Sequence, residues 1–219
     1  MGHAHEHGND DDAVEFTPEF WDERYGSAEQ IWSGNPNPHL VGTAADLTPG
    51  AALDVGAGEG ADALWLARHG WAVTAVDISQ VALDRAARHA ETADPQAAAR
   101  ILWSKTDVLD WDPGVALYDL VSAQFMHLRE PDLRDLHRRL ARAVRPGGVL
   151  LVVGHHPSQV HAPHGPHRAE LLFTAEDMGV SLDPAAWDVS ATSPERTVVD
   201  AEGQPVVMRD AVLRAVRRG

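Results

Sequence analysis

The sequence AALDVGAGEGADALWLARHGWAVTAVD, residues 51–77, indicates the architecture expected for this chain. Residues 51–55 form a short apolar run that ends at the glycine-rich segment 56–60, and apolar residues at helical spacing follow over 61–69. A second apolar run covers residues 71–76. A buried strand, a glycine loop, a helix and another buried strand predict parallel strands that are connected by a helix.

The same alternation continues further along the chain. Ser79 is placed to cap a helix, and short apolar runs predict strands at 101–103, 118–122 and 149–153. Leucines at helical spacing predict another helix before the last run, and this helix stops at RPGG, residues 145–148. We therefore expect a doubly wound, Rossmann-like α/β fold, in which helices cover both faces of a mostly parallel, seven-stranded sheet.

The two ends of the chain depart from this alternation. Residues 187–199 and 206–216 are rich in β-forming residues and flank the turn-like segment 200–205, which predicts a C-terminal antiparallel hairpin at the edge of the sheet. Near the N-terminus, residues 17–26 and 38–47 each begin with a capping residue or a proline. These two segments therefore predict two helices that form an N-terminal cover.

The sequence predicts one folded domain over residues 16–219 and a disordered tail over residues 1–15. The tail holds His3, His5 and His7 and the run NDDD, with almost no apolar residue to bury. A length of 219 residues with 44% hydrophobic content suits a single globular domain.

The composition excludes several classes of function. With 33 acidic and 18 basic side chains the formal net charge is -15, which disfavours a nucleic acid partner. The chain has no cysteine, so disulfides, thiolate metal sites and a cysteine nucleophile are excluded. No stretch approaches the roughly 20 apolar residues of a membrane span, and the N-terminus lacks the order of a signal peptide. We therefore expect a cytoplasmic protein with no membrane partner.

The glycine-rich segment is the first candidate for a binding site. Gly56, Gly58 and Gly60 let backbone amides approach a ligand, and the following helix directs its positive end at the same place. Asp77 ends the next strand about 20 residues later, where a carboxylate accepts hydrogen bonds from ribose hydroxyls. Asp54 would repel a pyrophosphate but could hold an ammonium group. These features predict an adenosine-type cofactor.

Two other functions remain open from the residues alone. Gly56, Gly58 and Ala61 satisfy the spacing GxGxxG/A, so an NAD(P)-dependent oxidoreductase would use the same loop. A non-catalytic, His-rich metal-binding protein could also keep this fold.

The motifs together resemble those of class I S-adenosylmethionine-dependent methyltransferases. The order and spacing of the family are matched by LDVGAGEG (53–60), VTAVDIS (73–79), KTDVLDW (105–111), YDLVSAQFMHL (118–128) and RPGGVLLVVG (145–154). The ends FWDERYGSAEQIWSGNPNP (20–38) and SPERTVVDAEGQPVVMRDAVLRAVRR (193–218) further resemble the small tellurite-resistance and thiopurine methyltransferase-like branch. The resemblance implies S-adenosylmethionine as the cofactor.

The resemblance also implies which residues hold that cofactor. Gly56, Gly58 and Gly60, with the backbone of Ala57, would hold its methionine part, and Asp54 would lie near its amino group. A cysteine is common in this branch where Ala57 stands, but the position contributes backbone. The other implied contacts are Asp77 and Ile78 for the ribose, Asp107 and Val108 for the adenine, Ser122 and Gln124 beside the sulfonium, and Trp32 in the cover.

Histidines at the carboxyl ends of predicted strands are candidates for the methyl-acceptor side, because open α/β sheets bind ligands there. His127 would act as a general base or simply pack beside Met126. His155 begins a His-rich loop that could bind a metal ion, but no carboxylate or helical spacing orders its imidazoles, so we assign no metal. The other histidines of this loop are His156, His161, His164 and His167.

Arg196, in the predicted hairpin, matches an arginine that the tellurite-resistance relatives place beside the acceptor. It could equally form an ordinary surface ion pair. Glu195 stands where those relatives have histidine, and a carboxylate there would repel tellurite or selenite. The expected reaction is methyl transfer to a small molecule, namely a thiol, a chalcogen oxyanion or another small nucleophile, by a monomer or homodimer.

Overall fold

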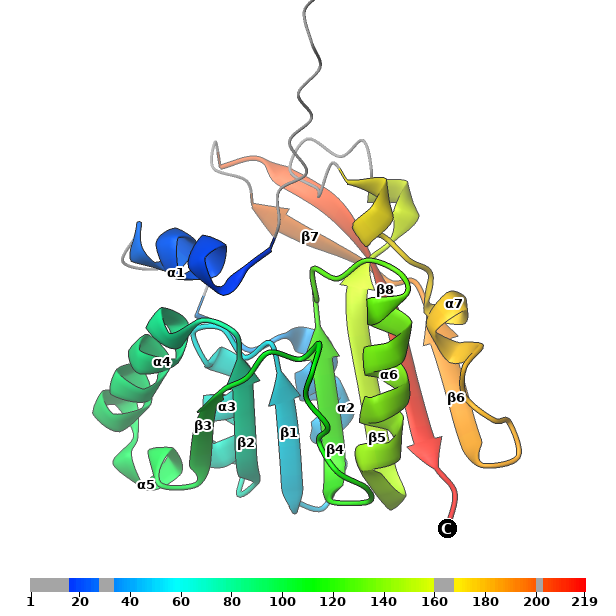
Figure 1. Ribbon diagram of the computed structural model, residues 1–219, viewed down its shortest axis with the longest axis horizontal. Coiled ribbons are helices and arrows are strands. Elements are labelled where there is room, and N and C mark those ends of the chain that lie inside the picture. Colours follow the sequence, from blue (N-terminus) through cyan, green and yellow to red (C-terminus); the bar gives the residue numbers. More distant parts are fainter. Residues whose placement is uncertain (1–15, 28–33, 160–167, 200–202) are drawn as a thin grey trace, which may run out of the picture.

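The computed structural model describes residues 16–27, 34–159, 168–199 and 203–219. Figure 1 shows one sheet whose parallel strands rise to a common edge, with helices on both faces and α1 above that edge. The strands are β1 (Ala51–Val55), β2 (Ala72–Asp77), β3 (Ile101–Lys105), β4 (Tyr118–Gln124), β5 (Val144–His155), β6 (Trp187–Thr192), β7 (Glu195–Val199) and β8 (Pro205–Arg217). The α-helices are α1 (Pro18–Gly26), α2 (Pro38–Ala44), α3 (Ala61–Arg68), α4 (Gln80–Ala93), α5 (Pro95–Ala98), α6 (Asp132–Ala143) and α7 (Ala175–Gly179). In these described segments no helix combines the length and apolarity that a bilayer span requires.

The sheet has the strand order β3-β2-β1-β4-β5-β8-β6, and β7 pairs with β8 beside that path. The first five strands of this order are parallel, whereas β8 runs antiparallel to β5, β6 and β7. The predicted doubly wound α/β fold with a C-terminal hairpin is confirmed. The sheet has eight strands rather than seven because the first hairpin arm is interrupted at residues 193–194. Pro194 cannot donate a backbone hydrogen bond there.

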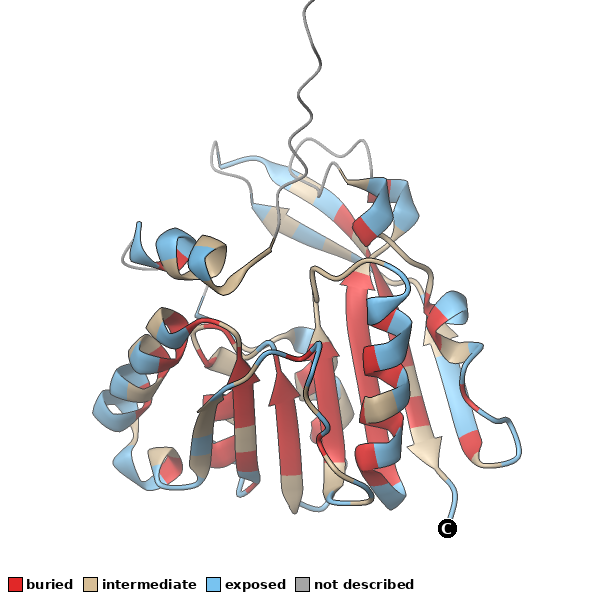
Figure 2. Cartoon of the chain, in the orientation of Figure 1, coloured by how far each residue is buried: buried red, intermediate tan, exposed pale blue. Residues whose placement is uncertain are grey.

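Hydrophobic clusters lie on both faces of the sheet. One contains Leu136 and Leu140 of α6 with Met178 of α7, and the other contains Leu40 of α2 with Leu66 of α3. Figure 2 shows the central strands buried along most of their length. Burial from both faces explains why these strands are continuously apolar in the sequence.

Most predicted element starts coincide with the observed ones. Thr17 Oγ1 accepts a hydrogen bond from Phe20 N at 3.2 Å, and Ser79 Oγ accepts one from Ala82 N at 3.1 Å, so both predicted caps are confirmed. Strand β5 is longer than predicted. It begins at Val144, and its pairing with β4 shifts register before the predicted strand at 149–153.

Candidate functional site

A cavity of about 620 Å³ lies at the carboxyl ends of the parallel strands, beside helix α1. This volume falls within the roughly 300–1,000 Å³ of small-molecule sites. The structure brings both predicted groups of residues to this one cavity. The predicted residues that line it are Asp54, Gly56, Ala57, Gly58, Gly60, Asp77, Ile78, Asp107, Val108, Gln124, His127, His155 and Arg196.

The glycine loop after β1 forms one wall of the cavity. Gly56, Gly58 and Gly60 have φ angles of +72°, +52° and +80°, in the region that favours glycine. A Cβ on Gly56 would lie 2.8 Å from Met126 Sδ, and a Cβ on Gly60 would lie 2.8 Å from Ala86 Cβ. The loop therefore needs glycine for both its conformation and its packing.

The carboxylates of Asp54, Asp62 and Asp77 gather beside this loop. Asp77 accepts hydrogen bonds from Gly58 N at 2.8 Å and from Ser79 N at 2.9 Å, and burial raises its pKa although these bonds oppose the rise. Asp54 is 3% exposed, and burial followed by the charges of Asp62 and Asp77 raises its pKa well above its ordinary value. Within the described segments, Asp54 Oδ2 has no hydrogen-bond partner.

Asp62, in the first turn of α3, connects three parts of the fold. Its Oδ1 accepts a hydrogen bond from Asn37 N at 2.6 Å, and its Oδ2 accepts one from Gln124 Nε2 at 2.6 Å. Burial raises the pKa of Asp62 to about 6. This end of the cavity, which we call the acidic end (Asp54, Asp62 and Asp77), therefore suits a ligand that carries positive charge or donates hydrogen bonds.

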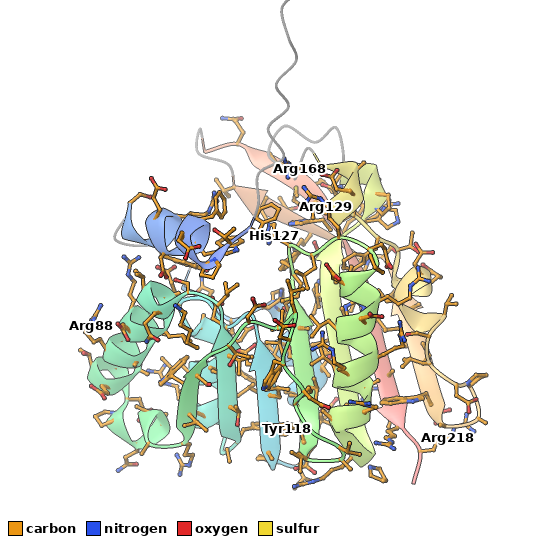
Figure 3. All side chains as sticks on the ribbon, viewed as in Figure 1. Arg88, Tyr118, His127, Arg129, Arg168 and Arg218 are labelled. Carbon is orange, nitrogen blue, oxygen red and sulfur yellow. The ribbon has the colours of Figure 1, made fainter. Side chains whose placement is uncertain are left out.

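His127 lies above the strand ends and beside helix α1 (Figure 3). Its ring centroid is 5.1 Å from that of Phe16 and 5.2 Å from that of Trp21. Burial, and then the charge of Arg24, lowers the pKa of His127, although a hydrogen bond with the Phe125 backbone opposes this. The ring is thus neutral near pH 7. One nitrogen donates to the Phe125 carbonyl and the other keeps its lone pair.

His155 and Arg196 both interact with Asp210, which is fully buried in β8. Arg196 Nε donates to Asp210 Oδ2 at 2.6 Å, and His39 Nε2 lies 3.0 Å from the same oxygen. Burial lowers the pKa of His155 to about 4 although the Asp210 charge opposes the shift. The Phe125 ring lies 4.6 Å from the His155 ring, centroid to centroid. Asp210 offsets the charge of Arg196 at this aromatic end (Phe16, Trp21, Phe125, His127, His155 and Arg196). The guanidinium carbons of Arg24 and Arg168 lie 6.0 Å and 5.8 Å from the ring centroids of Trp21 and Phe16.

Three residues of the site were not predicted from the sequence, namely Asp62, Asp210 and His39. Asp62 had a signal, because it is an acid two residues after the last glycine of the loop. Asp210 also had one, since it interrupts the apolar run at 206–216, and in the sheet it lies opposite His155. Nothing near His39 in the sequence indicated its contact with Asp210, which lies 171 residues away.

Ser122, which was predicted beside the sulfonium, is fully buried and is not among the residues that line the cavity. Its Oγ accepts a hydrogen bond from Gln124 Nε2 at 3.0 Å, and Gln124 does line the cavity. Trp32, the tail at 1–15 and the three loop histidines His161, His164 and His167 lie outside the described residues. Within the described ranges, no three histidine or acidic side chains are grouped to hold a metal ion.

The sequence matches known methyltransferases. Residues 52–148 match the family described as "Methyltransferase domain". The "Probable thiol methyltransferase 2" of Arabidopsis thaliana is 30% identical over 138 residues, which cover 61% of this chain. The chain spans 60% of the length of that relative.

Solved structures share the fold. A structure from work on the conversion of a disulfide bond into a thioacetal group during echinomycin biosynthesis is 24% identical, with a TM-score of 0.71 over 92% of this chain and 91% of that one. The N-methyltransferase NodS from Bradyrhizobium japonicum, in complex with S-adenosyl-L-homocysteine, is 18% identical. Its TM-score is 0.65 over 92% of this chain and 98% of that one. At these identities the likeness concerns the fold.

Proposed function

The chain belongs to the class I S-adenosylmethionine-dependent methyltransferases, and we propose that it transfers the methyl group of this cofactor to a small thiol. The observation that carries the proposal is the division of one cavity into an acidic end beside a glycine loop and an aromatic end with neutral imidazoles. A cationic cofactor suits the first end. An uncharged, polarisable nucleophile suits the second.

The residues at the acidic end fit S-adenosylmethionine. Asp54 Oδ2, buried without a partner in the described structure, is an acceptor for the cofactor's ammonium group. Asp77 is an acceptor for ribose hydroxyls at the end of β2, while Asp107 and Val108 line the cavity where the adenine would lie. When bound, the cofactor would supply a methyl group on a positively charged sulfur. A nucleophile in line with the carbon–sulfur bond would take that methyl group and displace the sulfur.

The aromatic end favours a neutral thiol over a chalcogen oxyanion. Arg196 is already paired with Asp210, and the low pKa of His155 leaves that ring uncharged at neutral pH. An oxyanion that entered this end would lose its hydration without meeting an unpaired charge among the described side chains of the wall. Phe16 and Trp21 supply apolar surface for the organic part of a thiol. The name of the Arabidopsis relative supports the same acceptor class.

His127 is the general base in this proposal. Met126, the preceding residue, packs against Gly56, so the loop that carries His127 adjoins the glycine loop. The thiol proton passes to the free ring nitrogen of His127 while the acceptor sulfur forms its bond to the methyl carbon. The bond from that carbon to the leaving sulfur breaks, and its electron pair stays on that sulfur. His155 and Arg196 border the acceptor and orient it.

A panel assay tests the acceptor class. The protein is incubated with S-adenosylmethionine and, separately, an alkyl thiol, an aryl thiol, a phenol, selenite or tellurite, and S-adenosylhomocysteine is measured by mass spectrometry. The proposal expects turnover to be fastest with a thiol. Turnover of the oxyanions without turnover of the thiols would contradict it.

A further inference from the structure

Helix α1 covers the aromatic end of the cavity. Phe16, just before the helix, and Trp21 and Tyr25, within it, line the cavity. Tyr25 is buried, but most other side chains of α1 are partly or fully exposed. A nine-residue helix is only marginally stable by itself in water. Its position above the strand ends (Figure 1) must therefore depend on contacts with the rest of the fold.

Asp22 connects α1 to the start of α4, the helix on which α1 packs. Its Oδ1 accepts a hydrogen bond from Ser79 Oγ at 2.5 Å and another from Val81 N at 3.2 Å. Ser79 is the N-cap of α4, so the Asp22 carboxylate lies at the positive end of that helix. Both hydrogen bonds are charge-assisted and therefore stronger than neutral ones.

Arg85, on α4, makes a second connection to α1. Its Nη2 donates to the Tyr25 carbonyl, at the end of α1, at 2.7 Å, and its Nη1 donates to Glu59 Oε1, in the glycine loop, at 3.0 Å. The Arg85 and Glu59 side chains are 24% and 11% exposed, so this pair is largely shielded from water. We call Asp22 and Arg85 the α1 anchor, because they hold the two ends of the helix.

His127 is the titratable group that this cover shields. The rings of Phe16 and Trp21 lie 5.1 Å and 5.2 Å from its ring, centroid to centroid, and exclude water from that side. Loss of hydration disfavours the charged form of an imidazole. Burial is the largest cause that lowers the pKa of His127, and the charge of Arg24, also on α1, is the next. Both causes depend on the position of α1.

Other titratable groups surround His127, and most of them lie on other elements. They are Tyr25 of α1, His155 of β5, Arg196 of β7, and Arg129, Arg168 and Glu170, of which the two arginines are labelled near His127 in Figure 3. The anchor residues are not among them. A variant of the anchor therefore removes none of these groups.

We propose that Asp22 and Arg85 are positioning residues for methyl transfer, because they hold α1 over His127 and keep this base out of water. The inference rests on the proposed function, in which His127 accepts the thiol proton. An imidazole shielded from water stays neutral at mildly acidic pH, so the anchor widens the pH range in which His127 can act. Neither Asp22 nor Arg85 is among the described residues that line the cavity, so both act through His127.

NMR titration of the His127 ring in the protein without cofactor tests the proposal, with the signal assigned by its loss in His127→Gln. The anchor variants are Asp22→Ala and Arg85→Gln, and Asp22→Asn is the conservative variant because it keeps an acceptor oxygen. The matched control is Arg88→Gln. Arg88 is exposed on the same helix and projects away from His127 in Figure 3.

We expect the pKa of His127 to rise toward the ordinary 6.5 in both anchor variants, to rise less in Asp22→Asn and to stay unchanged in Arg88→Gln. Removal of the negative charge of Asp22 would by itself lower the pKa of His127, whereas removal of the positive charge of Arg85 would raise it. A rise in both variants therefore reports hydration of the ring and not the removed charge. An unchanged pKa in both would overturn the inference.

The pH profile of thiol methylation is the second measurement. The ratio of kcat/KM of an anchor variant to that of wild type should fall by up to about fourfold between pH 8 and pH 6, because more of its His127 is protonated. Ionisation of the thiol is common to both proteins and cancels in this ratio. Affinity for S-adenosylhomocysteine should stay within about threefold, since the anchor does not line the cavity.

Two outcomes of the pH profile would contradict different parts of the account. The same fractional loss of kcat/KM at pH 8 and pH 6, in an active wild-type enzyme, would overturn the role of the anchor and leave the proposed function intact. Absence of turnover with every thiol in the wild-type protein would refute the proposed function, and the catalytic role of the anchor with it.

Discussion

The two ends of the cavity are built in different ways. The acidic end comes mainly from residues 54–77, in which strand, loop, helix and strand follow one another directly. At the aromatic end, His39 of α2, Arg196 of β7 and Asp210 of β8 join three distant parts of the chain. A local segment can be recognised from its spacing. A site assembled from distant segments depends on the packing of the whole fold.

The largest expected effect concerns the buried charge at the aromatic end. Asp210→Ala leaves Arg196 and His39 without their shared acceptor, and we expect the free energy of unfolding to fall by about 3–5 kcal/mol. Urea unfolding followed by circular dichroism measures it. Glu195→Ala is the matched control in the same hairpin, because its exposed pair with Arg209 should contribute under about 1 kcal/mol. Similar losses in both variants would show that Asp210 does not hold this end together.

The next-largest expected effect is on kcat, and it should occur without a change in cofactor affinity. His127→Gln removes the proposed base and should lower kcat for the thiol by roughly a hundredfold. Calorimetric affinity for S-adenosylhomocysteine should stay within about twofold, because His127 belongs to the aromatic end. His155→Gln is the comparison, and it should act mainly on KM. A kcat loss confined to His155→Gln would transfer the base role to that residue.

Asp77→Asn should impair cofactor binding rather than methyl transfer to the thiol. It removes the charged acceptor at the end of β2, and we expect the affinity for S-adenosylhomocysteine to fall by about 1–3 kcal/mol. The KM for the thiol, measured at saturating cofactor, should not change. An unchanged cofactor affinity would contradict the ribose assignment.

The last expected effect is on the pH dependence of stability, to which His137 and Asp62 contribute with opposite sign. Burial lowers the pKa of His137 to about 4, below the ordinary 6.5, so the unfolded chain binds more protons between these values and stability falls as the pH drops through this window. Asp62 behaves the other way. Its pKa of about 6 lies above the ordinary 3.8, so its ionised form costs stability as the pH rises through this range.

Urea unfolding at pH 7.5 and pH 5 measures both responses. His137→Asn should reduce the acid-induced loss by roughly 2 kcal/mol. Asp62→Asn should stabilise the free protein more at pH 7.5 than at pH 5. Parallel pH curves for wild type and both variants would rule out these shifts.

The difference between the local acidic end and the long-range aromatic end also explains which features could be predicted from the sequence. Apolar runs and glycine spacing predicted the sheet, its helices and most of the acidic end, because each depends on neighbours in the chain. The interrupted hairpin at residues 193–194 and the bulge at the start of β5 depend on pairing with β8 and β4, which periodicity does not encode. Asp210 could be noticed as a charge in an apolar strand, but its partners His39 and Arg196 could not.

If the acidic end binds S-adenosylmethionine, it should also bind the product of the reaction, S-adenosylhomocysteine. Calorimetric titration of the wild-type protein with S-adenosylhomocysteine and, separately, with NAD⁺ tests it most directly. We expect one site per chain for S-adenosylhomocysteine and no measurable heat of binding for NAD⁺, because the Asp54 carboxylate would repel a pyrophosphate. Binding of NAD⁺ without binding of S-adenosylhomocysteine would contradict it.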